Sequence, residues 1–335
     1  MKKKKFVFCS IDGKWSGYLH SAFSDLMKDD RVIWLNDRYK ELRFPLLKWL
    51  RKIHLSSKIN NIIRLPGRRI WSYALDTVQW DDDTDYYVIF LDNILPIDPE
   101  YLKSLKKKHS IKYVLFLINS WIPPHDERAQ KSIDAIPFDY IFSYNPDDAK
   151  KLGFIFTDNI YSMRSDVAVQ AMQYDLYYIG GNNGRLQDAL AVYAGAKAAG
   201  VKQLFRISGV NKEDMVYQNE IIYNQFINYG ESVNELLGAN CILELMRRHE
   251  TGMCASARYY EAICYNKKLL TNNKNIVNLP FYQLEYMHVF ETPDDIDWEW
   301  VKEQIPIDYH YDGRFSPSRL IDRIIDLEKE RTIES

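Results

Sequence analysis

The sequence predicts an α/β protein of two Rossmann-like domains facing a cleft, with a helix at the carboxyl terminus. Its 335 residues suit about two domains, because a typical domain has roughly 150 residues. Runs such as Tyr86–Asp92 (YYVIFLD) are apolar on both faces, which is typical of parallel strands covered by helices. Helical patterns separate these runs, and such an alternation favours doubly wound sheets.

The first domain is expected at residues 1–165, and its boundary falls in a linker at Tyr161–Gln173. Its predicted strands are Lys5–Ile11, Val32–Asn36, Tyr86–Asp92, Ile111–Asn119 and Asp139–Tyr144. Its predicted helices are Tyr18–Lys28, Pro45–Arg64, Pro99–Lys108 and His125–Ile136.

The second domain is expected at residues 166–335, where a new series of strands and helices starts. A strand ending in YYIGG leads through a glycine-rich turn into a helix that Gly200 stops. The next predicted strands are KQLFRISG and KLLTNN; SVNELLGANCILELM is helical or mixed, and SARYYEAICYNK is a helix. The tail SPSRLIDRIIDLEKERT forms the terminal helix, capped by Ser316.

The composition limits the classes of function. Lys and Arg number 44 against 46 Asp and Glu, which argues against a nucleic-acid binder. No apolar stretch approaches the ~20 residues of a membrane-spanning helix. The amino-terminal apolar run stops at Asp12, too early for a signal peptide, so we expect a cytoplasmic protein. Because the cysteines form no CxxC pair and the histidines show no metal spacing, we expect buried thiols, no metal and no cofactor.

The turn after YYIGG is the first candidate site. In an open parallel sheet, ligands bind beyond the carboxyl ends of the strands, and helix N-termini at this edge favour phosphate. Gly180, Gly181 and Gly184 allow the backbone to approach a ligand closely. Arg185 starts the next helix, where its guanidinium can hold phosphate oxygens bidentately. A flexible turn with a solvent-exposed arginine is the alternative interpretation.

The second candidate site is a helix start at Ser256. This residue is placed to cap a helix that carries Arg258 and Glu261 on one face, three residues apart. In the functional interpretation, Ser256 faces phosphate while Glu261 accepts hydrogen bonds from ribose hydroxyls. A surface ion pair, which is worth little, is the alternative interpretation.

These segments carry a resemblance to a known family. The series DLYYIGGNNGR, FINYGESVNELLGANCILEL and SARYYEAICYNKKLLTNN resembles the C-terminal half of GT-B-fold glycosyltransferases. It is most similar to bacterial enzymes of lipopolysaccharide and capsular polysaccharide biosynthesis. The match covers residues 175–273, and the first half is similar only in its alternation of strands and helices.

The resemblance implies a GT-B-like fold whose second domain binds a nucleotide-sugar donor. Arg185 matches the basic residue that family members place against the donor diphosphate, and Glu261 matches the glutamate that binds the ribose or sugar. Ser256 and Arg258 match the polar helix start near the phosphates. The expected donor-binding set is completed by Gly181, Gly184 and Glu231, while Tyr229 and Glu244 match the pattern without an assigned role.

Two positions depart from the family pattern. Leu190 stands five residues after Arg185, where many GT-B enzymes have a lysine. Met253 stands eight residues before Glu261, where a second glutamate belongs. The residues expected to replace the missing cation are Lys267, Lys268 or Arg206.

The acid–base residue is expected in the first domain. An inverting transferase needs one base to deprotonate the acceptor hydroxyl. The loop SIDGKWSGYLH offers Asp12 as the first choice and His20 as the second, and Asp92 is a third candidate. A turn-forming or helix-capping role is the alternative for Asp12. The cluster WDDDTD (Asp81–Asp85) has the composition of a GT-A metal site but precedes its strand, so a solvated loop is the better interpretation.

The stretch Lys40–Arg69 is basic and amphipathic. It holds nine Lys or Arg residues against Glu41 alone, a net charge of +8, interleaved with apolar residues that include Trp49. Such a helix can lie on an anionic membrane surface, which predicts peripheral contact with the cytoplasmic face of the membrane. A solvated helix with an ordinary core face is the alternative.

The sequence thus predicts a metal-independent glycosyltransferase. It would transfer a sugar from a nucleotide-sugar donor to a saccharide or lipid-linked saccharide acceptor in cell-surface polysaccharide synthesis. The alternatives are a catalytically inactive, two-lobed nucleotide- or sugar-binding partner subunit and a metal-dependent transferase of the GT-A type.

Overall fold

The structure is a computed structural model of the chain, and it falls into two compact units. Unit 1 comprises Met1–Asn159 with Pro317–Ser335, and unit 2 comprises Ile160–Ser316. The residues that the structure describes are 2–9, 21–35, 39–63, 70–91, 98–117, 133–164, 167, 170–247 and 255–334. The terminal helix therefore belongs to unit 1, whereas it was expected in the second domain, residues 166–335.

Unit 1 contains a six-stranded parallel sheet in the order β2-β1-β3-β4-β5-β6. The strands are β1 (Lys3–Cys9), β2 (Val32–Leu35), β3 (Thr84–Leu91), β4 (Ile111–Leu117), β5 (Tyr140–Ser143) and β6 (Ile155–Phe156). Five of them confirm predicted strands, and β6 is an addition of two residues. Because β3 and β4 are buried on both faces, their continuous apolar runs fit this central position.

The helices of unit 1 differ in places from the prediction. They are α2 (Pro45–His54), α3 (Ser57–Ile62), α4 (Pro99–Lys108), α6 (Pro146–Leu152) and α11 (Ser318–Glu334), with 3-10 turns at Ser24–Lys28 and Ala74–Thr77. The single helix predicted at Pro45–Arg64 is wrong, because Ser56 is extended and separates α2 from α3. In the predicted helix Tyr18–Lys28, the described residues that are helical are 21–22 and the 3-10 turn. In the predicted helix His125–Ile136, the described residues that are helical are 133–135.

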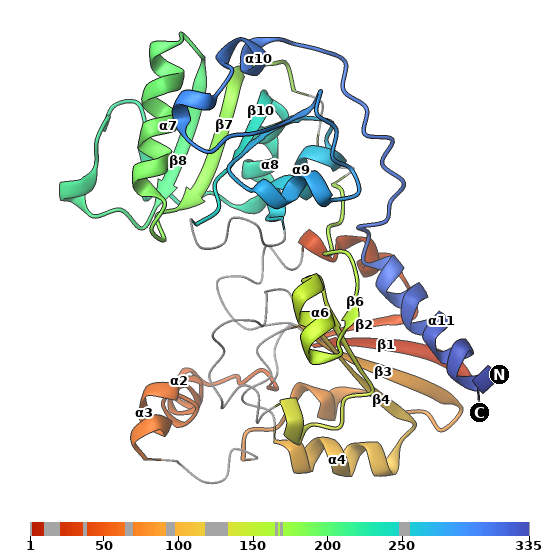
Figure 1. Cartoon of the computed structure of the whole chain (residues 1–335). Coiled ribbons are helices and arrows are strands. Elements are labelled where there is room, and N and C mark those ends of the chain that lie inside the picture. The colour runs from red at the N-terminus through yellow and green to blue at the C-terminus, as the bar shows by residue number, and fades with distance from the viewer. Residues whose placement is uncertain are drawn as a thin grey trace. The chain divides into compact units, whose positions relative to one another are not determined.

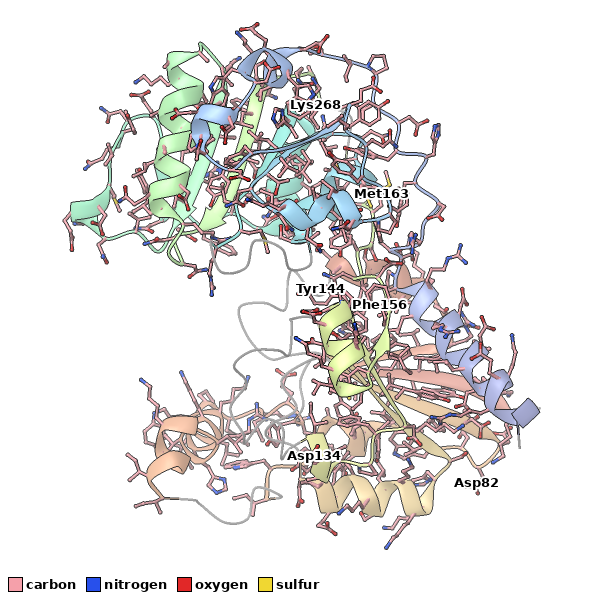
Figure 2. The ribbon with its side chains drawn as sticks, in the orientation of Figure 1. Asp82, Asp134, Tyr144, Phe156, Met163 and Lys268 are labelled. Carbon is pink, nitrogen blue, oxygen red and sulfur yellow. The ribbon has the colours of Figure 1, made fainter. Side chains whose placement is uncertain are left out.

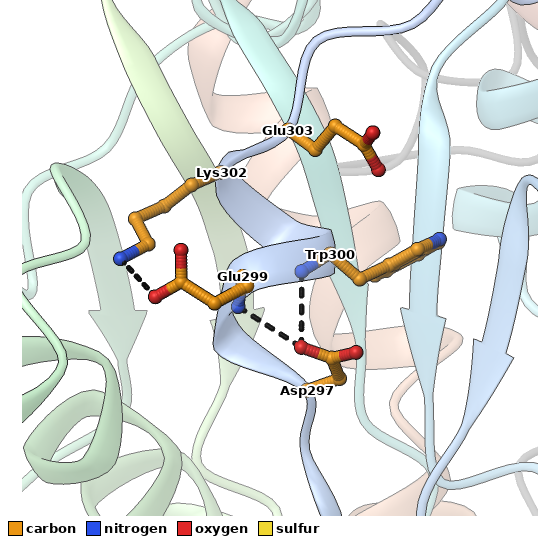
Figure 3. A pocket seen from close by; sticks show the side chains of 5 residues that line it. All are labelled: Asp297, Glu299, Trp300, Lys302 and Glu303. Carbon is orange, nitrogen blue, oxygen red and sulfur yellow. Dashed lines mark hydrogen bonds and ion pairs between the residues drawn. The ribbon is translucent and has the colours of Figure 1, made fainter.

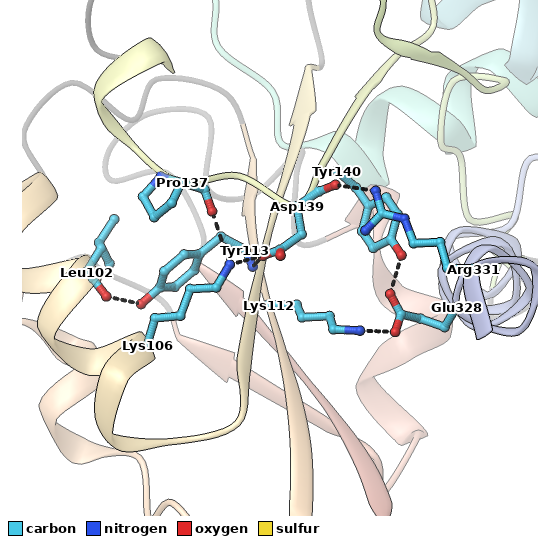
Figure 4. Close-up of polar contacts among 9 residues, drawn as sticks. All are labelled: Leu102, Lys106, Lys112, Tyr113, Pro137, Asp139, Tyr140, Glu328 and Arg331. Atoms are coloured by element: carbon cyan, nitrogen blue, oxygen red, sulfur yellow. Dashed lines mark hydrogen bonds and ion pairs between the residues drawn. The ribbon is translucent and has the colours of Figure 1, made fainter. Parts of the chain in front are cut away.

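Polar contacts explain why α11 belongs to unit 1 (Figure 4). Glu328 of α11 accepts hydrogen bonds from Lys112 of β4 and from the Tyr140 hydroxyl of β5. The guanidinium of Arg331 lies 4.4 Å from the Tyr140 ring and donates to the carbonyl of Asp139 at 3.3 Å. These contacts fix the helix against the two strands that precede it by about 190–220 positions in the chain.

Unit 2 contains a second six-stranded parallel sheet in the order β12-β11-β10-β7-β8-β9. Its strands are β7 (Tyr174–Gly181), β8 (Gln203–Ser208), β9 (Ile222–Tyr223), β10 (Ala239–Glu244), β11 (Lys268–Thr271) and β12 (Met287–Val289). The strand order reverses between β7 and β10, as in a Rossmann sheet, and this reversal defines a switch point where ligands bind at the carboxyl edge.

Helices cover both faces of the second sheet (Figure 1). They are α7 (Leu186–Ala198), α8 (Tyr229–Leu237), α9 (Ala257–Cys264) and α10 (Trp298–Lys302), with 3-10 turns at Lys212–Asp214, Lys274–Asn278 and Pro293–Asp295. Along β7, Tyr178 packs in the core with α7, and Tyr177 packs in the core with α8 and α9. The α/β fold class with two parallel sheets and a terminal helix is therefore confirmed.

No described helix is both long and apolar enough to cross a membrane. Cys9, Cys241 and Cys264 are buried, as expected, and burial raises the pKa of the Cys241 thiol. Cys254 lies outside the described residues.

Candidate functional site

The glycine-rich turn joins β7 to α7 as predicted. Asn182 donates its backbone N–H to the carbonyl of Ser208 at 2.7 Å, and Arg185 donates its backbone N–H to the carbonyl of Asn182 at 2.6 Å. Gly184 has a φ of +80°, and a Cβ there would meet nothing within 4 Å. The left-handed backbone at 184 therefore favours glycine, and its site is open enough for close approach of a ligand.

Arg185 lies at the switch point of the sheet. Its Nη1 donates to the carbonyl of Leu245 at 2.9 Å, and its Nη2 donates to the carbonyl of Gly181 at 3.1 Å. Leu245 directly follows β10, and Gly181 is the last residue of β7, so the guanidinium joins the carboxyl ends of the two strands between which the order reverses. Its Nε is buried and has no hydrogen-bond partner among the described residues.

Tyr178 of β7 is a further polar residue of this region, which the sequence pattern did not mark. Its hydroxyl is buried without a partner in the described part of the chain. Burial raises the pKa of Tyr178, and the charges of Arg185 and Arg258 oppose that rise. Gly180 lies two residues after Tyr178, on the same face of β7. A Cβ on Gly180 would stand 2.5 Å from the Tyr178 hydroxyl, which explains why this position is a glycine.

The start of α9 is fastened to the carboxyl edge by Glu244. Ser256 caps α9 by accepting from the Arg258 backbone N–H at 3.2 Å, as predicted. The Ser256 N–H donates to Glu244 Oε1 at 2.8 Å, and the Thr271 hydroxyl donates to Oε2 at 2.6 Å. Glu244 is buried at the end of β10, so it holds the start of α9 against β10 and β11.

Glu261 lies in an internal network. Its carboxylate is 0% exposed, pairs with Arg258 and accepts from the Tyr229 hydroxyl at 3.0 Å. The Tyr229 hydroxyl also lies 2.7 Å from that of Tyr161. Burial raises the pKa of Glu261, while Glu261 keeps the pKa of Arg258 above its ordinary value against the cost of burial. The alternative of a surface ion pair is wrong, and contact with a ribose would require the covering side chains to move.

Glu231 has a local structural role. Its carboxylate accepts from the backbone N–H of Asn228 at 2.9 Å, and Asn228 Oδ1 accepts from the Glu231 N–H at 2.9 Å. This reciprocal pair caps the start of α8. The structure therefore gives Glu231 a capping function, and a donor contact at this residue stays a prediction.

The expected substitute cations have partners of their own in the structure. Lys268 starts β11, at the amino edge, and donates to the carbonyls of Trp300 and Glu303 at 2.6 Å (Figure 2). The residue before it, Lys267, donates to a backbone carbonyl at 2.7 Å, and burial lowers its pKa to about 8. Arg206 is engaged by the carboxylate of Glu235 at 2.6 Å. Arg258 lies in the first turn of α9, whose start Glu244 holds at the carboxyl edge.

A cavity of about 650 Å³ lies elsewhere, around α10 (Figure 3). Its lining residues are Asp297, Glu299, Trp300, Lys302 and Glu303. Asn240, near the start of β10, donates to the carbonyl of Val301 at 2.8 Å, which places α10 at the amino edge of the sheet. With three carboxylates and one lysine, this cavity disfavours phosphate.

The expected catalytic residues Asp12 and His20, and the third candidate Asp92, lie outside the described residues, as does Met253. The strands they follow, β1 and β3, are paired neighbours, and the strand order of unit 1 reverses between them. Asp82 lies in the turn before β3, so the aspartate cluster is at the amino edge, as predicted (Figure 2). Among the described residues, no group of three or more His, Cys, Asp or Glu side chains could hold a metal ion.

No family model and no curated protein matches the sequence. Solved structures are similar over most of the chain. UDP-N-acetylglucosamine 2-epimerase from Rickettsia bellii is 13% identical with a TM-score of 0.48, covering 97% of this chain and 96% of its own. T4 phage BGT with its UDP-glucose substrate is 11% identical with a TM-score of 0.38, covering 89% of this chain and 88% of its own. The spinosyn rhamnosyltransferase SpnG is 10% identical with a TM-score of 0.44, covering 93% of this chain and 92% of its own. At these values the similarity carries no argument about activity.

Proposed function

We propose that the chain is a glycosyltransferase that moves a sugar from a nucleotide-sugar donor to a saccharide or lipid-linked saccharide acceptor in cell-surface polysaccharide synthesis. One observation carries the donor site: Arg185 bonds the carboxyl ends of both strands at the switch point of unit 2, and Arg258 lies in the first turn of α9, which starts at the same edge. This is the edge at which doubly wound sheets bind nucleotides.

The proposed diphosphate contacts come from the guanidinium groups and two helix starts. Of the five N–H groups of an arginine side chain, Arg185 uses two on backbone carbonyls and has a third on the buried Nε, which leaves about two for phosphate oxygens. The starts of α7 and α9 add backbone N–H groups and the positive ends of two helix dipoles. Glu261 holds the Arg258 side chain, so it acts on the site through that cation.

These contacts suit a transfer reaction because the leaving nucleoside diphosphate gains negative charge in the transition state. Fixed cations that are already positioned stabilise this charge without reorganising, so they raise the rate as well as the affinity. Arg185 is fixed in this sense, since two backbone carbonyls hold its guanidinium. For the base that deprotonates the acceptor, we retain Asp12 as the first choice and His20 as the second.

A catalytically inactive nucleotide-binding subunit is the second candidate. Two observations favour it: Glu261 is buried, and Leu190 packs against the α7 core where the family pattern has a lysine. Such a subunit would keep nucleotide binding and lack transfer.

The test is a thermal-shift screen of nucleotides and nucleotide sugars on the whole chain, followed by assays of donor hydrolysis and transfer. We expect one class of nucleoside diphosphate to raise the melting temperature of the wild type and of Arg319→Ala, an exposed arginine of α11, but not that of Arg185→Ala. A shift without sugar release from any donor would favour the inactive subunit. No shift with any nucleotide would refute both candidates. A chelator should leave transfer unchanged, and loss of activity would instead favour the metal-dependent alternative.

A further inference from the structure

Helix α2 presents its apolar face outward. Leu46, Trp49, Leu50 and Ile53 follow the spacing i, i+3, i+4 and i+7, which places them on one side of the helix. Leu46 is 66% exposed, Trp49 57% and Leu50 40%, and none of the helix residues is buried. An amphipathic helix of a globular protein normally turns this side to the core, whereas in α2 this side is exposed.

The rest of unit 1 holds α2 by its other side. Arg51 donates to the carbonyl of Lys40 at 2.7 Å, and its guanidinium lies 5.5 Å from the ring of Tyr39. At the end of the helix, the indole N–H of Trp71 donates to Nδ1 of His54 at 2.6 Å. These contacts fix the orientation of the helix and leave its apolar side uncovered.

The uncovered area continues beyond α2. We call it the α2–α3 surface and define its apolar members as Phe44, Leu46, Trp49, Leu50, Ile62 and Ile63. Phe44, directly before α2, is 67% exposed, and Ile62 at the end of α3 is 85% exposed. The two helices contact each other at the margin of unit 1, away from α11 (Figure 1). Large exposed apolar side chains gathered on two contacting helices are typical of an interaction site.

Positive charge surrounds the α2–α3 surface. The described residues 40–63 include six Lys or Arg against the single acidic residue Glu41; the exposed ones among them include Lys40, Arg43, Lys48, Lys52 and Lys58. Long basic side chains at the border of an apolar area can reach lipid phosphates while the apolar residues enter the acyl boundary. A second copy of this chain would bring like charges together, and charge complementarity therefore selects an anionic partner.

We propose that the α2–α3 surface docks on the headgroup region of an anionic lipid bilayer, with Leu46 and Trp49 inserted. This inference is independent of the proposed enzymatic function, because it needs neither donor nor acceptor. It would place the protein where lipid-linked substrates are found.

The test is flotation of the whole chain with vesicles of phosphatidylcholine, alone or mixed with phosphatidylglycerol, without nucleotide. We expect binding to the mixed vesicles that falls as salt is added. The double variant Leu46→Ser with Trp49→Ser should reduce this partitioning roughly tenfold or more, and Lys48→Gln with Lys52→Gln by about 30-fold. Matched controls are Phe226→Ser, an exposed apolar residue of unit 2, and Lys150→Gln with Lys151→Gln in α6; both should bind as the wild type does.

Three results would overturn the proposal. The first is a wild type that does not float with anionic vesicles, and the second is unchanged partitioning of the Leu46→Ser, Trp49→Ser variant. The third is a wild-type dimer that the same variant converts to a monomer, since a second copy would then be the occupant. Because the substituted side chains are exposed, the circular dichroism spectrum of each variant should match the wild type.

Discussion

Replacing Arg185 by alanine is expected to weaken the binding of a nucleoside diphosphate by roughly 30- to 150-fold. Hydrogen bonds between charged groups contribute about 1.5–3 kcal/mol, and a loss of about 2–3 kcal/mol corresponds to this change in Kd. Arg185 has an unpartnered Nε and uses two of its N–H groups on backbone carbonyls, so its remaining donors are already oriented by the fold. The variant Arg185→Lys keeps the positive charge but loses the planar guanidinium that can bind two phosphate oxygens at once. We therefore expect it to weaken nucleoside diphosphate binding by about tenfold.

The assay is isothermal titration calorimetry with the nucleoside diphosphate that gives the largest thermal shift. Arg185→Ala also removes two hydrogen bonds to the carbonyls of Leu245 and Gly181, which should lower the free energy of unfolding by about 1–3 kcal/mol. The titrations are therefore made at a temperature where urea unfolding shows every variant to be folded, with Arg319→Ala as the charge control. An Arg185→Ala protein that binds as tightly as Arg319→Ala would refute the assigned role of this guanidinium.

Three further predictions concern stability. Gly184→Ala should lower the free energy of unfolding by about 1 kcal/mol, because φ is +80° at this residue. Gly184→Asn should lower it by less, because asparagine tolerates this backbone conformation better than alanine. Equal losses for the two variants in urea titrations would contradict this conformational explanation. Burial raises the pKa of Glu328, but its contacts with Lys112 and Tyr140 and the charge of Arg331 together lower it by more, so the net shift is downward. The stabilisation by Glu328 is therefore present above its ordinary pKa and is lost as pH falls through the folded-state value. Glu328→Gln should thus cost about 1 kcal/mol at neutral pH and progressively less in acid, as urea titrations across pH would show; a constant difference would argue against this ion pair. Glu244→Gln should increase hydrogen exchange at the start of α9, where the Ser256 N–H loses a charged acceptor, and unchanged exchange would mean that other contacts hold this helix.

The sequence predicts most of the sheet framework because burial on both faces leaves a continuous apolar signal. YYVIFLD and YVLFLIN carry it over seven residues each, and both are central strands. The edge strands β9 and β12, of two and three residues, are too short to show a period. The extended backbone of Ser56 separates α2 from α3. The basic and apolar residues around Ser56 continue the same pattern on both sides, so the sequence does not predict this break.

The candidate site was predicted in part. Arg185 at the switch point follows from the rule that loops at carboxyl ends meet at one edge, together with the glycine turn. The Arg-x-x-Glu spacing fixes only that Arg258 and Glu261 share a helix face, and the sequence does not tell which face is buried. Asn228 and Glu231 are three residues apart at the start of α8. This spacing is typical of a capping box, so it favours a capping role for Glu231 over ligand binding.

The most direct test of the central claim is hydrogen exchange of the whole chain with and without a saturating nucleoside diphosphate. If the carboxyl edge of the second sheet binds the diphosphate, exchange should slow at residues 182–188 and 256–260, the starts of α7 and α9, and stay unchanged at residues 297–303. Protection confined to residues 297–303, or absent from both helix starts while calorimetry shows binding, would contradict the account.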